Sequence, residues 1–246
     1  MSKIKVMTWN VLYKEKADNI LALTMEIKPD ILCCQEITKD SFVNPSRDVP
    51  KEIGNMLGGD YRYHQVLDSL EDQSSNMGNA IFSKYPITRE RHLLLQKSGA
   101  DINSSSQNRG YLEIQTKIDN VIFTIGTTHL SYVDGFVETN ARNKEADKLI
   151  NLIKHKQQKF IVCGDFNSDP NSKTINKLEQ LLASTGPPHE LKTFTTKPFV
   201  HNNFVVEGLE WRLDYIFTTR DVKVLSSKII NTEFSDHLPI VVELEF

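Results

Sequence analysis

Cysteine is scarce in this sequence of 246 residues, which contains only Cys33, Cys34 and Cys163. All three lie in apolar stretches and two are adjacent, a spacing that suits neither a disulfide framework nor a zinc site. A free cysteine behaves as a small buried hydrophobe. We therefore expect three reduced cysteines in the core.

Long apolar runs are also missing. No run reaches the ~20 residues that a membrane-spanning helix needs. The first residues lead into a strand-like segment without the apolar region of a signal peptide. We therefore expect an intracellular, cytoplasmic protein with no membrane span.

The sequence has no excess of positive charge. Its 29 Lys and Arg residues face 32 Asp and Glu residues, which gives a formal net charge of −3. This balance disfavours a broad basic face that grips duplex nucleic acid non-specifically, although local basic patches remain compatible with it. The hydrophobic content of 39% and the charged content of 25% are ordinary for a soluble globular protein.

Strand-like segments recur along the whole chain, whereas helix-like segments are few. The strands are expected at residues 4–9, 31–34, 80–83, 111–117, 121–129, 160–163, 213–218 and 240–244. Helices are expected at 16–27, 137–154 and 172–182, and loops at 41–59, 68–78, 97–109 and 185–203. There is no internal repeat, so we expect one domain over residues 1–246. The pattern predicts an α+β sandwich of two packed sheets with helices on the outer faces.

Polar residues follow three of the expected strands. Asn10 closes the first, Glu36 follows the second, and His129 ends the strand at 121–129. Each has a simple structural explanation, because asparagine is a common turn residue, a carboxylate at a strand end meets solvent, and a lone histidine is often only hydrogen-bonded. None of the three indicates a function alone.

Two further segments carry more information. Asp165 and Asn167 follow a buried strand and are two residues apart, so in extended backbone they point to the same side. Asp236 and His237 are adjacent between apolar segments, and Asp214 lies on an upstream strand. A histidine needs a partner on its second nitrogen to fix its tautomer, and Asp214 is the natural candidate for His237.

Carboxylates and amides without paired cysteines favour a hard, oxygen-binding cation over zinc. Magnesium takes one or two protein carboxylates and keeps several waters, which leaves room for a phosphate group. Neutral asparagines and histidines bind phosphoryl oxygens without adding negative charge. The residues therefore indicate metal-assisted phosphoryl chemistry.

Six motifs occur in order and resemble one family. The sequence resembles the endonuclease/exonuclease/phosphatase superfamily of deoxyribonuclease-like phosphodiesterases over residues 4–244, and the segment 78–87 adds to the likeness. The motifs are Thr8-Trp9-Asn10, Gln35-Glu36, Thr128-His129-Leu130, Gly164-Asp165-Phe166-Asn167, Asp214-Tyr215-Ile216-Phe217 and Ser235-Asp236-His237.

The resemblance implies a four-layer α/β sandwich of mainly antiparallel sheets with the active site at one edge. It implies Glu36 as the principal Mg²⁺ ligand, with Asn10 nearby and Asp236 as a second or water-mediated ligand; Mn²⁺ would be able to substitute. Asp165 would orient or deprotonate the attacking water, and Asn167 would position the water or the phosphate. His237, held by Asp214, and His129 would contact the phosphate. Whether the base is Asp165 or His237 stays open.

The sequence predicts the substrate less specifically than it predicts the type of reaction. The segment from Gly164 to Pro170 resembles deadenylase-like and general bacterial members, and the Ser-Asp-His ending also matches tyrosyl-DNA phosphodiesterases. We expect a nucleic-acid phosphodiester, single-stranded or end-specific, cleaved by a monomer. The alternatives are an inositol phosphate or phospholipid headgroup, and a non-catalytic binding module, which would have lost motif residues. Substrate contacts are predicted for Asn79, Arg142, Tyr132, Phe166 and Trp211.

Overall fold

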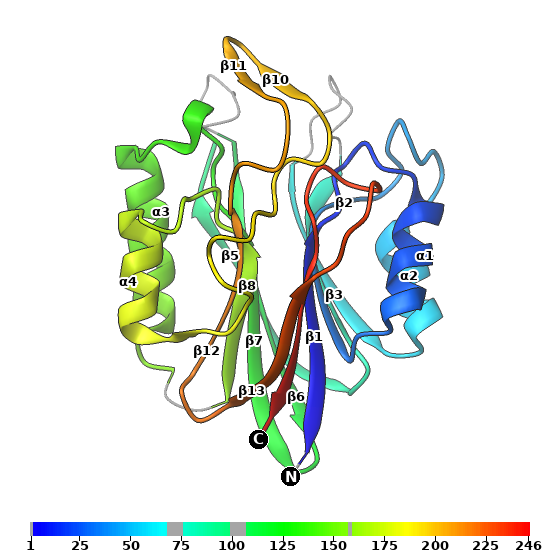
Figure 1. Cartoon of the computed structure of the whole chain (residues 1–246). Coiled ribbons are helices and arrows are strands. Elements are labelled where there is room, and N and C mark those ends of the chain that lie inside the picture. The colour runs from blue at the N-terminus through cyan, green and yellow to red at the C-terminus, as the bar shows by residue number, and fades with distance from the viewer. Residues whose placement is uncertain (1, 68–75, 99–106, 157–158) are drawn as a thin grey trace.

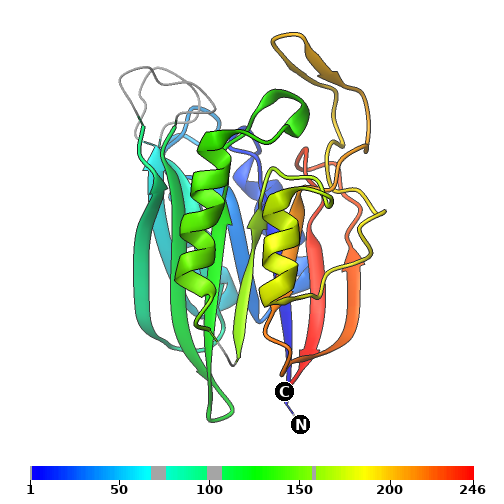
Figure 2. The same cartoon turned by 90° about the vertical axis from the view of Figure 1, so that its left-hand side faces the viewer.

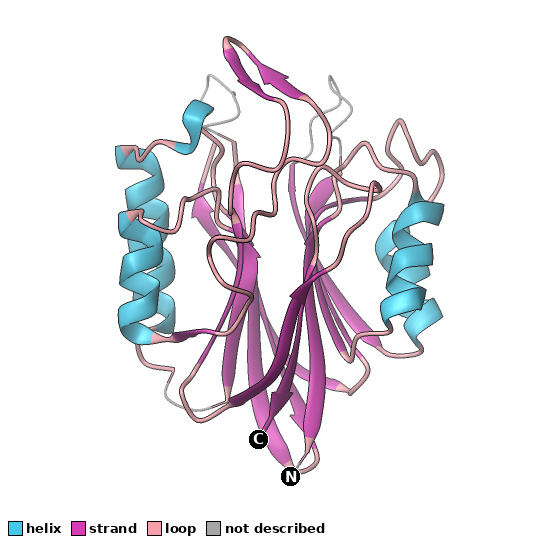
Figure 3. Ribbon diagram, in the orientation of Figure 1, coloured by secondary structure: helices cyan, strands magenta, loops and turns pink. Residues whose placement is uncertain are grey.

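The computed structural model describes residues 2–67, 76–98, 107–156 and 159–246. Two six-stranded sheets lie face to face, and a pair of helices covers the outer face of each (Figures 1 and 3). The predicted α+β, four-layer sandwich is therefore confirmed. In Figure 2 the α3 and α4 helices stand in front of the sheet that they cover.

The first sheet has one parallel pair of strands among antiparallel neighbours. Among the described strands of this sheet, β1 and β2 form the parallel pair, and α1 (Ala17–Ile27) connects them, while α2 (Val49–Leu57) lies beside α1. The order across this sheet is β13 (Lys223–Ile229), β14 (Ile240–Glu245), β1 (Lys3–Asn10), β2 (Ile31–Thr38), β4 (Met77–Ser83) and β3 (Asp60–Leu67).

The second sheet repeats this pattern. Only β7 and β8 run parallel, and their connection contains the short η1 (Asp134–Phe136) and α3 (Asn140–Ile153). The order is β5 (Ile87–Gln96), β6 (Arg109–Ile118), β7 (Val121–His129), β8 (Phe160–Asp165), β12 (Asp214–Thr218) and β9 (Ala183–Ser184). The remaining elements are α4 (Lys173–Leu181) and a hairpin of β10 (Phe199–His201) and β11 (Phe204–Val206).

Three apolar layers fill the space between the four layers of secondary structure. Successive side chains of a strand point to opposite faces. Ile4 and Val6 of β1 therefore enter the layer between the sheets, whereas Met7 and Trp9 enter the layer beneath α1 and α2. A third layer lies beneath α3 and α4. All three cysteines are buried and free, as predicted.

The two parallel pairs place the carboxyl ends of four strands at one edge of the sandwich. Parallel strands need a crossover connection, and their carboxyl ends then meet at the same edge. The chain termini lie at the opposite edge, and the β10–β11 hairpin rises above the edge where β1 and β8 end (Figure 1). This edge carries the polar motifs.

The three predicted helices are confirmed within a few residues at each end. The prediction of a loop over residues 41–59 is wrong, because α2 occupies much of that segment. Its start and stop signals are in the sequence: Asp48 accepts a hydrogen bond from the Lys51 N–H, and Gly58 ends the helix in the left-handed region at φ 65°.

The edge strands β3, β5 and β13 were not predicted. Most side chains of β5 and β13 are exposed and most of those of β3 are half-buried, so the apolar alternation that marks a strand with one buried face is weak. Residues 185–203 lack regular structure except for β10, and the predicted loops at 68–78 and 97–109 lie mostly outside the described residues. Within the described ranges, no helix is long and apolar enough to cross a membrane.

Gly164 explains why β7 and β8 can approach closely just before Asp165. Its φ of 144° lies where side chains are rarely tolerated, and a Cβ there would lie 2.0 Å from the Thr128 carbonyl oxygen. The clash is with backbone, so a rotamer change cannot relieve it.

We expect Gly164→Ala to lower the free energy of unfolding by about 3 kcal/mol, through backbone strain and forced separation of the two strands. Urea denaturation followed by circular dichroism would measure the change. Gly208→Ala is the control, because a Cβ at Gly208 meets nothing within 4 Å. Equal stability of the two variants would contradict this account.

Candidate active site

Four of the predicted site residues are fixed at strand ends by the pairing of the strands. Asn10 ends β1, His129 ends β7, Asp165 ends β8, and Asp214 begins β12. Asp165 is the cross-strand partner of both His129 and Asp214. The strand register therefore sets these three side chains side by side across the second sheet.

Glu36 is positioned by an irregularity in β2. The pairing of β2 with β4 shifts register between Cys34 and Ile37, and Glu36 has a φ of 57°. Such a bulge re-aims a side chain that regular pairing would point elsewhere. The Glu36 carboxylate accepts hydrogen bonds from Asn10 Nδ2 at 3.1 Å and from the Tyr13 N–H at 3.3 Å.

Asn10 connects the acidic groups of the two sheets. Its Nδ2 donates to Glu36 Oε1 at 3.1 Å and to Asp165 Oδ2 at 3.0 Å, while its Oδ1 accepts from the Leu12 N–H at 3.1 Å. Asn10 is buried, so its donors are not shared with bulk water. The amide therefore holds two carboxylates from different sheets within reach of one another.

Asn167 supports both Asp165 and His129. Its N–H donates to Asp165 Oδ1 at 2.8 Å, and its Nδ2 contacts Leu130 O at 2.9 Å and His129 Nε2 at 3.0 Å. Because an amide nitrogen only donates, Nε2 of His129 accepts, and the neutral ring then carries its proton on Nδ1. Asp165 and Asn167 thus address one region, as predicted, but not through the extended backbone on which the prediction rested, because Asn167 has a φ of 47°.

His129 is held in the neutral form. Burial, Arg109 and His237 together keep the pKa of His129 well below its usual range. Its Nε2 lies 3.5 Å from Asp165 Oδ2, and its Nδ1 lies 3.9 Å from Glu36 Oε1. A neutral imidazole between these carboxylates offers one N–H donor without a fixed charge.

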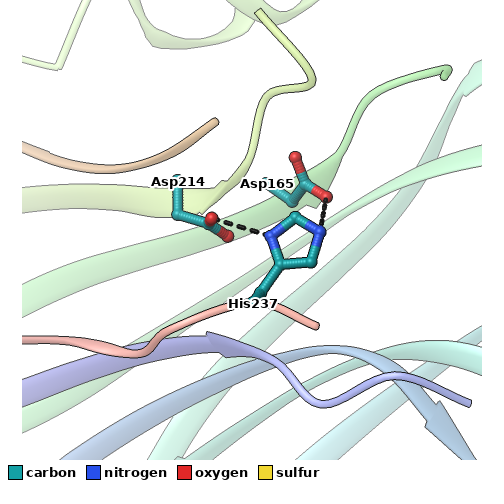
Figure 4. Close-up of side chains that lie close together, drawn as sticks. All are labelled: Asp165, Asp214 and His237. Atoms are coloured by element: carbon teal, nitrogen blue, oxygen red, sulfur yellow. Dashed lines mark hydrogen bonds and ion pairs between the residues drawn. The ribbon is translucent and has the colours of Figure 1, made fainter. Parts of the chain in front are cut away.

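His237 lies between two carboxylates (Figure 4). Its Nδ1 donates to Asp214 Oδ2 at 2.8 Å, and its Nε2 lies 3.6 Å from Asp165 Oδ2. Burial would lower the pKa of His237, but Asp214 and Asp165 outweigh it and hold that pKa well above its usual range. The pairing of Asp214 with His237, inferred from the sequence, is present.

The pKa of Asp165 is shifted in opposite directions by its surroundings. Burial raises its pKa, His237 lowers it, and Asp214 raises it again, with a net upward shift. A carboxyl group whose charged form is disfavoured holds a proton more readily than an exposed aspartate does. This property suits a group that exchanges protons during a reaction.

The loop that carries Asp236 and His237 is tied to the end of β1. The Ser235 hydroxyl donates to the Asn10 carbonyl at 2.7 Å and accepts from the His237 N–H at 3.0 Å. The Trp9 indole N–H donates to the His237 carbonyl at 3.1 Å. Ser235 had been assigned no role of its own, although it stands inside a motif.

The residues at this edge fit a divalent cation. Glu36 and Asp236 offer carboxylate oxygens, which hard cations prefer, while Asn10 directs its Nδ2 to Glu36 and its Oδ1 to the Leu12 N–H and so orients the carboxylate. Burial and the nearby Asp236 charge raise the pKa of Glu36, so a positive charge between these groups would relieve an existing electrostatic cost. A second group of possible ligand atoms, which lie within 4.8 Å of one another, belongs to Asp165, Asp214 and His237. In that group, Asp214 Oδ2 and His237 Nδ1 are already hydrogen-bonded to each other.

Two of the predicted substrate contacts are wrong. Phe166 is fully buried in the layer beneath α3 and α4, where it packs against Tyr215 and Phe217. The buried Arg142 directs its guanidinium to the carbonyls of Ser131 and Phe136. An arginine committed to backbone carbonyls is a structural residue, not a phosphate ligand.

The other three predicted contacts have different surroundings. Asn79 is buried and donates to the Gly110 carbonyl at 3.0 Å. Tyr132 and Trp211 are half-buried in an aromatic cluster that also contains Phe136 and Phe194. Phe194 contacts the His237 ring, with centroids 4.8 Å apart. The cluster therefore adjoins the site, and substrate contact by these three residues stays a prediction.

The fold and the site together define an enzyme that hydrolyses phosphoric esters. The chain belongs to the Endonuclease/Exonuclease/phosphatase family, whose sequence model matches residues 7–237. Members of this family generally depend on a divalent metal ion. A sequence search of curated proteins finds no match.

Solved structures share the fold at low sequence identity. An endonuclease/exonuclease/phosphatase from Beutenbergia cavernae has a TM-score of 0.79 at 17% identity and covers 99% of this chain and 72% of its own. The human Nocturnin catalytic domain has a TM-score of 0.71 at 21% identity, with coverages of 99% and 94%. A mannosyl-6-phosphatase from Bacteroides thetaiotaomicron has a TM-score of 0.68 at 18% identity, with coverages of 99% and 100%.

The assignment of Glu36 as the metal anchor can be tested without an activity assay. Mg²⁺ that binds only the folded state should raise the melting temperature, with a stabilisation that grows as the logarithm of 1 + [Mg²⁺]/Kd, and Glu36→Gln should remove most of this increase. Differential scanning fluorimetry with added Mg²⁺ would measure it. Glu207→Gln, at an exposed position in the hairpin connection, should retain the full increase. A normal increase in Glu36→Gln would show that the cation binds elsewhere.

Proposed function

We propose that this chain is a Mg²⁺-dependent phosphodiesterase that acts on nucleic acid, at single-stranded or terminal positions. The observation that carries the proposal is the Asn10 bridge, which brings an oxygen-ligand group around Glu36 next to Asp165 and its two histidines. Cation ligands and proton-transfer groups thus lie within one hydrogen-bond network.

Mg²⁺ held by Glu36, with Asn10 and Asp236 nearby, would polarise a phosphoryl oxygen and offset negative charge. Asp165 takes the proton of the attacking water, because its neighbouring carboxylates keep the His237 ring, whose Nε2 lies 3.6 Å from Asp165 Oδ2, in the protonated form that cannot accept one. Asp214 keeps the His237 ring oriented, and the charge on that ring stabilises the phosphorane-like transition state. His129, neutral and fixed by Asn167, donates to a phosphoryl oxygen.

The preference for nucleic acid rests on the aromatic cluster beside His237. Tyr132 and Trp211 are half-buried there, and aromatic rings stack on bases whatever the sequence. The net charge of −3 fits a short or single-stranded substrate better than extensive duplex contact. A phosphomonoester is the second candidate, because a mannosyl-6-phosphatase shares the fold.

We expect Asp165→Asn and His237→Ala each to reduce turnover by about 10²–10⁴ while the fold is retained, because each removes a proton-transfer or charge-stabilising group. Hydrolysis of bis-p-nitrophenyl phosphate with and without Mg²⁺ would measure this, and circular dichroism would verify the fold. His189→Ala is the matched control, since His189 contacts Ser184 and Glu179 instead. Near-normal rates in both site variants would contradict the catalytic roles proposed for Asp165 and His237.

The substrate class can be decided by a panel. Abasic duplex, single-stranded DNA, poly(A), 5′-tyrosyl DNA, sphingomyelin, inositol phosphates and a sugar phosphomonoester would be compared at equal concentration with Mg²⁺. We expect the highest kcat/KM on a single-stranded or end-containing nucleic acid. Cleavage restricted to the lipid, inositol or sugar substrates would overturn the nucleic-acid proposal and leave the ester-hydrolase assignment intact.

A further inference from the structure

The segment Thr193–Thr196 joins the chain that leads into β12, where Asp214 lies, to the loop that carries His237. On one side, the N–H groups of Thr193 and Phe194 donate to the Trp211 carbonyl at 2.8 and 3.0 Å. On the other side, the Leu238 N–H donates to the Thr193 carbonyl at 2.8 Å, and the Thr196 N–H donates to the Asp236 carbonyl at 3.0 Å. The segment therefore fixes how far apart these two parts of the chain lie.

The side chain of Thr193 also binds the backbone at the start of β12. Its hydroxyl oxygen accepts hydrogen bonds from the Leu213 N–H at 3.1 Å and from the Asp214 N–H at 3.3 Å. Thr193 is fully buried, so water cannot replace this acceptor. If the hydroxyl were removed, these two N–H groups at the start of β12 would lose their acceptor. A buried N–H group without an acceptor is costly in free energy, so we expect the backbone to shift until each group finds another partner.

The Asp214 carboxylate depends on its backbone for orientation. Its Oδ2 bonds to His237 Nδ1, whereas its buried Oδ1 has no hydrogen-bond partner among the described residues. With a single side-chain hydrogen bond, the direction of the carboxylate follows the position of the Asp214 main chain. Thr193 holds that main chain, and through its carbonyl it also holds Leu238, which follows His237.

We propose that Thr193 is a positioning residue that sets the geometry of the Asp214–His237 pair and so supports turnover without touching the substrate. Phe194 completes the arrangement, since its ring lies 4.8 Å from the His237 ring at 47°. The inference rests on the proposed roles of Asp214 and His237.

Two substitutions separate the hydroxyl from the shape of the side chain. Thr193→Val keeps the volume and removes the acceptor, whereas Thr193→Ser keeps the acceptor. We expect kcat on bis-p-nitrophenyl phosphate with Mg²⁺ to fall about 10- to 100-fold in Thr193→Val with KM nearly unchanged, because small misplacements of a catalytic group cost up to about 10²-fold. Thr193→Ser should restore most of the rate.

Thr195→Val is the matched control. Thr195 is buried in the same segment, but its hydroxyl donates to the Lys197 carbonyl at 2.6 Å and accepts from the Lys197 N–H at 3.3 Å, so within the described part of the chain its hydrogen bonds stay local. The second readout is the low-field proton resonance of the Asp214–His237 hydrogen bond in the metal-free chain, assigned by its loss in His237→Ala. This resonance should shift or broaden in Thr193→Val and remain unchanged in Thr195→Val.

The outcomes distinguish this inference from the proposed function. If His237→Ala loses activity but Thr193→Val keeps both normal kcat and an unshifted resonance, the positioning role is wrong and the proposed function stands. Equal losses in Thr193→Val and Thr195→Val would show a general effect of the segment and would also reject the inference. If His237→Ala and Asp165→Asn are both fully active, the proposed function itself fails.

Discussion

The amide of Asn10 is the contact on which the site depends, because it is shared by one carboxylate from each sheet. Glu36 and Asp165 would repel each other if both were charged and unbridged in this buried environment. A neutral donor between them lowers that cost without supplying a charge. Burial raises the pKa of both carboxyl groups, and the charge of Asp236 raises that of Glu36 further while the charge of Asp214 raises that of Asp165, so a nearby cation would stabilise the charged forms.

Electrostatic balance divides the site into two parts. Around Glu36 the groups are oxygen ligands with excess negative charge, whereas around His237 the two carboxylates stabilise a positive ring. His129 lies between the parts and stays neutral, since burial and the neighbouring Arg109 and His237 oppose its protonation. A phosphate group that contacts both parts would meet the proposed cation ligands on one side and hydrogen-bond donors on the other.

Much of this arrangement was accessible from the sequence, because it depends on strand ends. Asp165 and Asn167 were predicted to face one region from their two-residue spacing, and Asp214 was predicted to pair with His237. The burial of Phe166 and Arg142 was missed, since proximity to a motif does not reveal which face of the sheet a side chain occupies. Thr193 gave no signal, because its hydrogen bonds join loops far apart in the chain.

The two sheets share one pairing pattern, and this similarity explains why the site lies between them. Each sheet has a single parallel pair near its centre, and each pair ends at the same edge with a polar residue. The first sheet supplies Asn10 and Glu36, and the second supplies His129 and Asp165. Neither sheet alone holds both the groups proposed as cation ligands and the groups proposed for proton transfer, so these groups meet because the two sheets pack through their apolar layer.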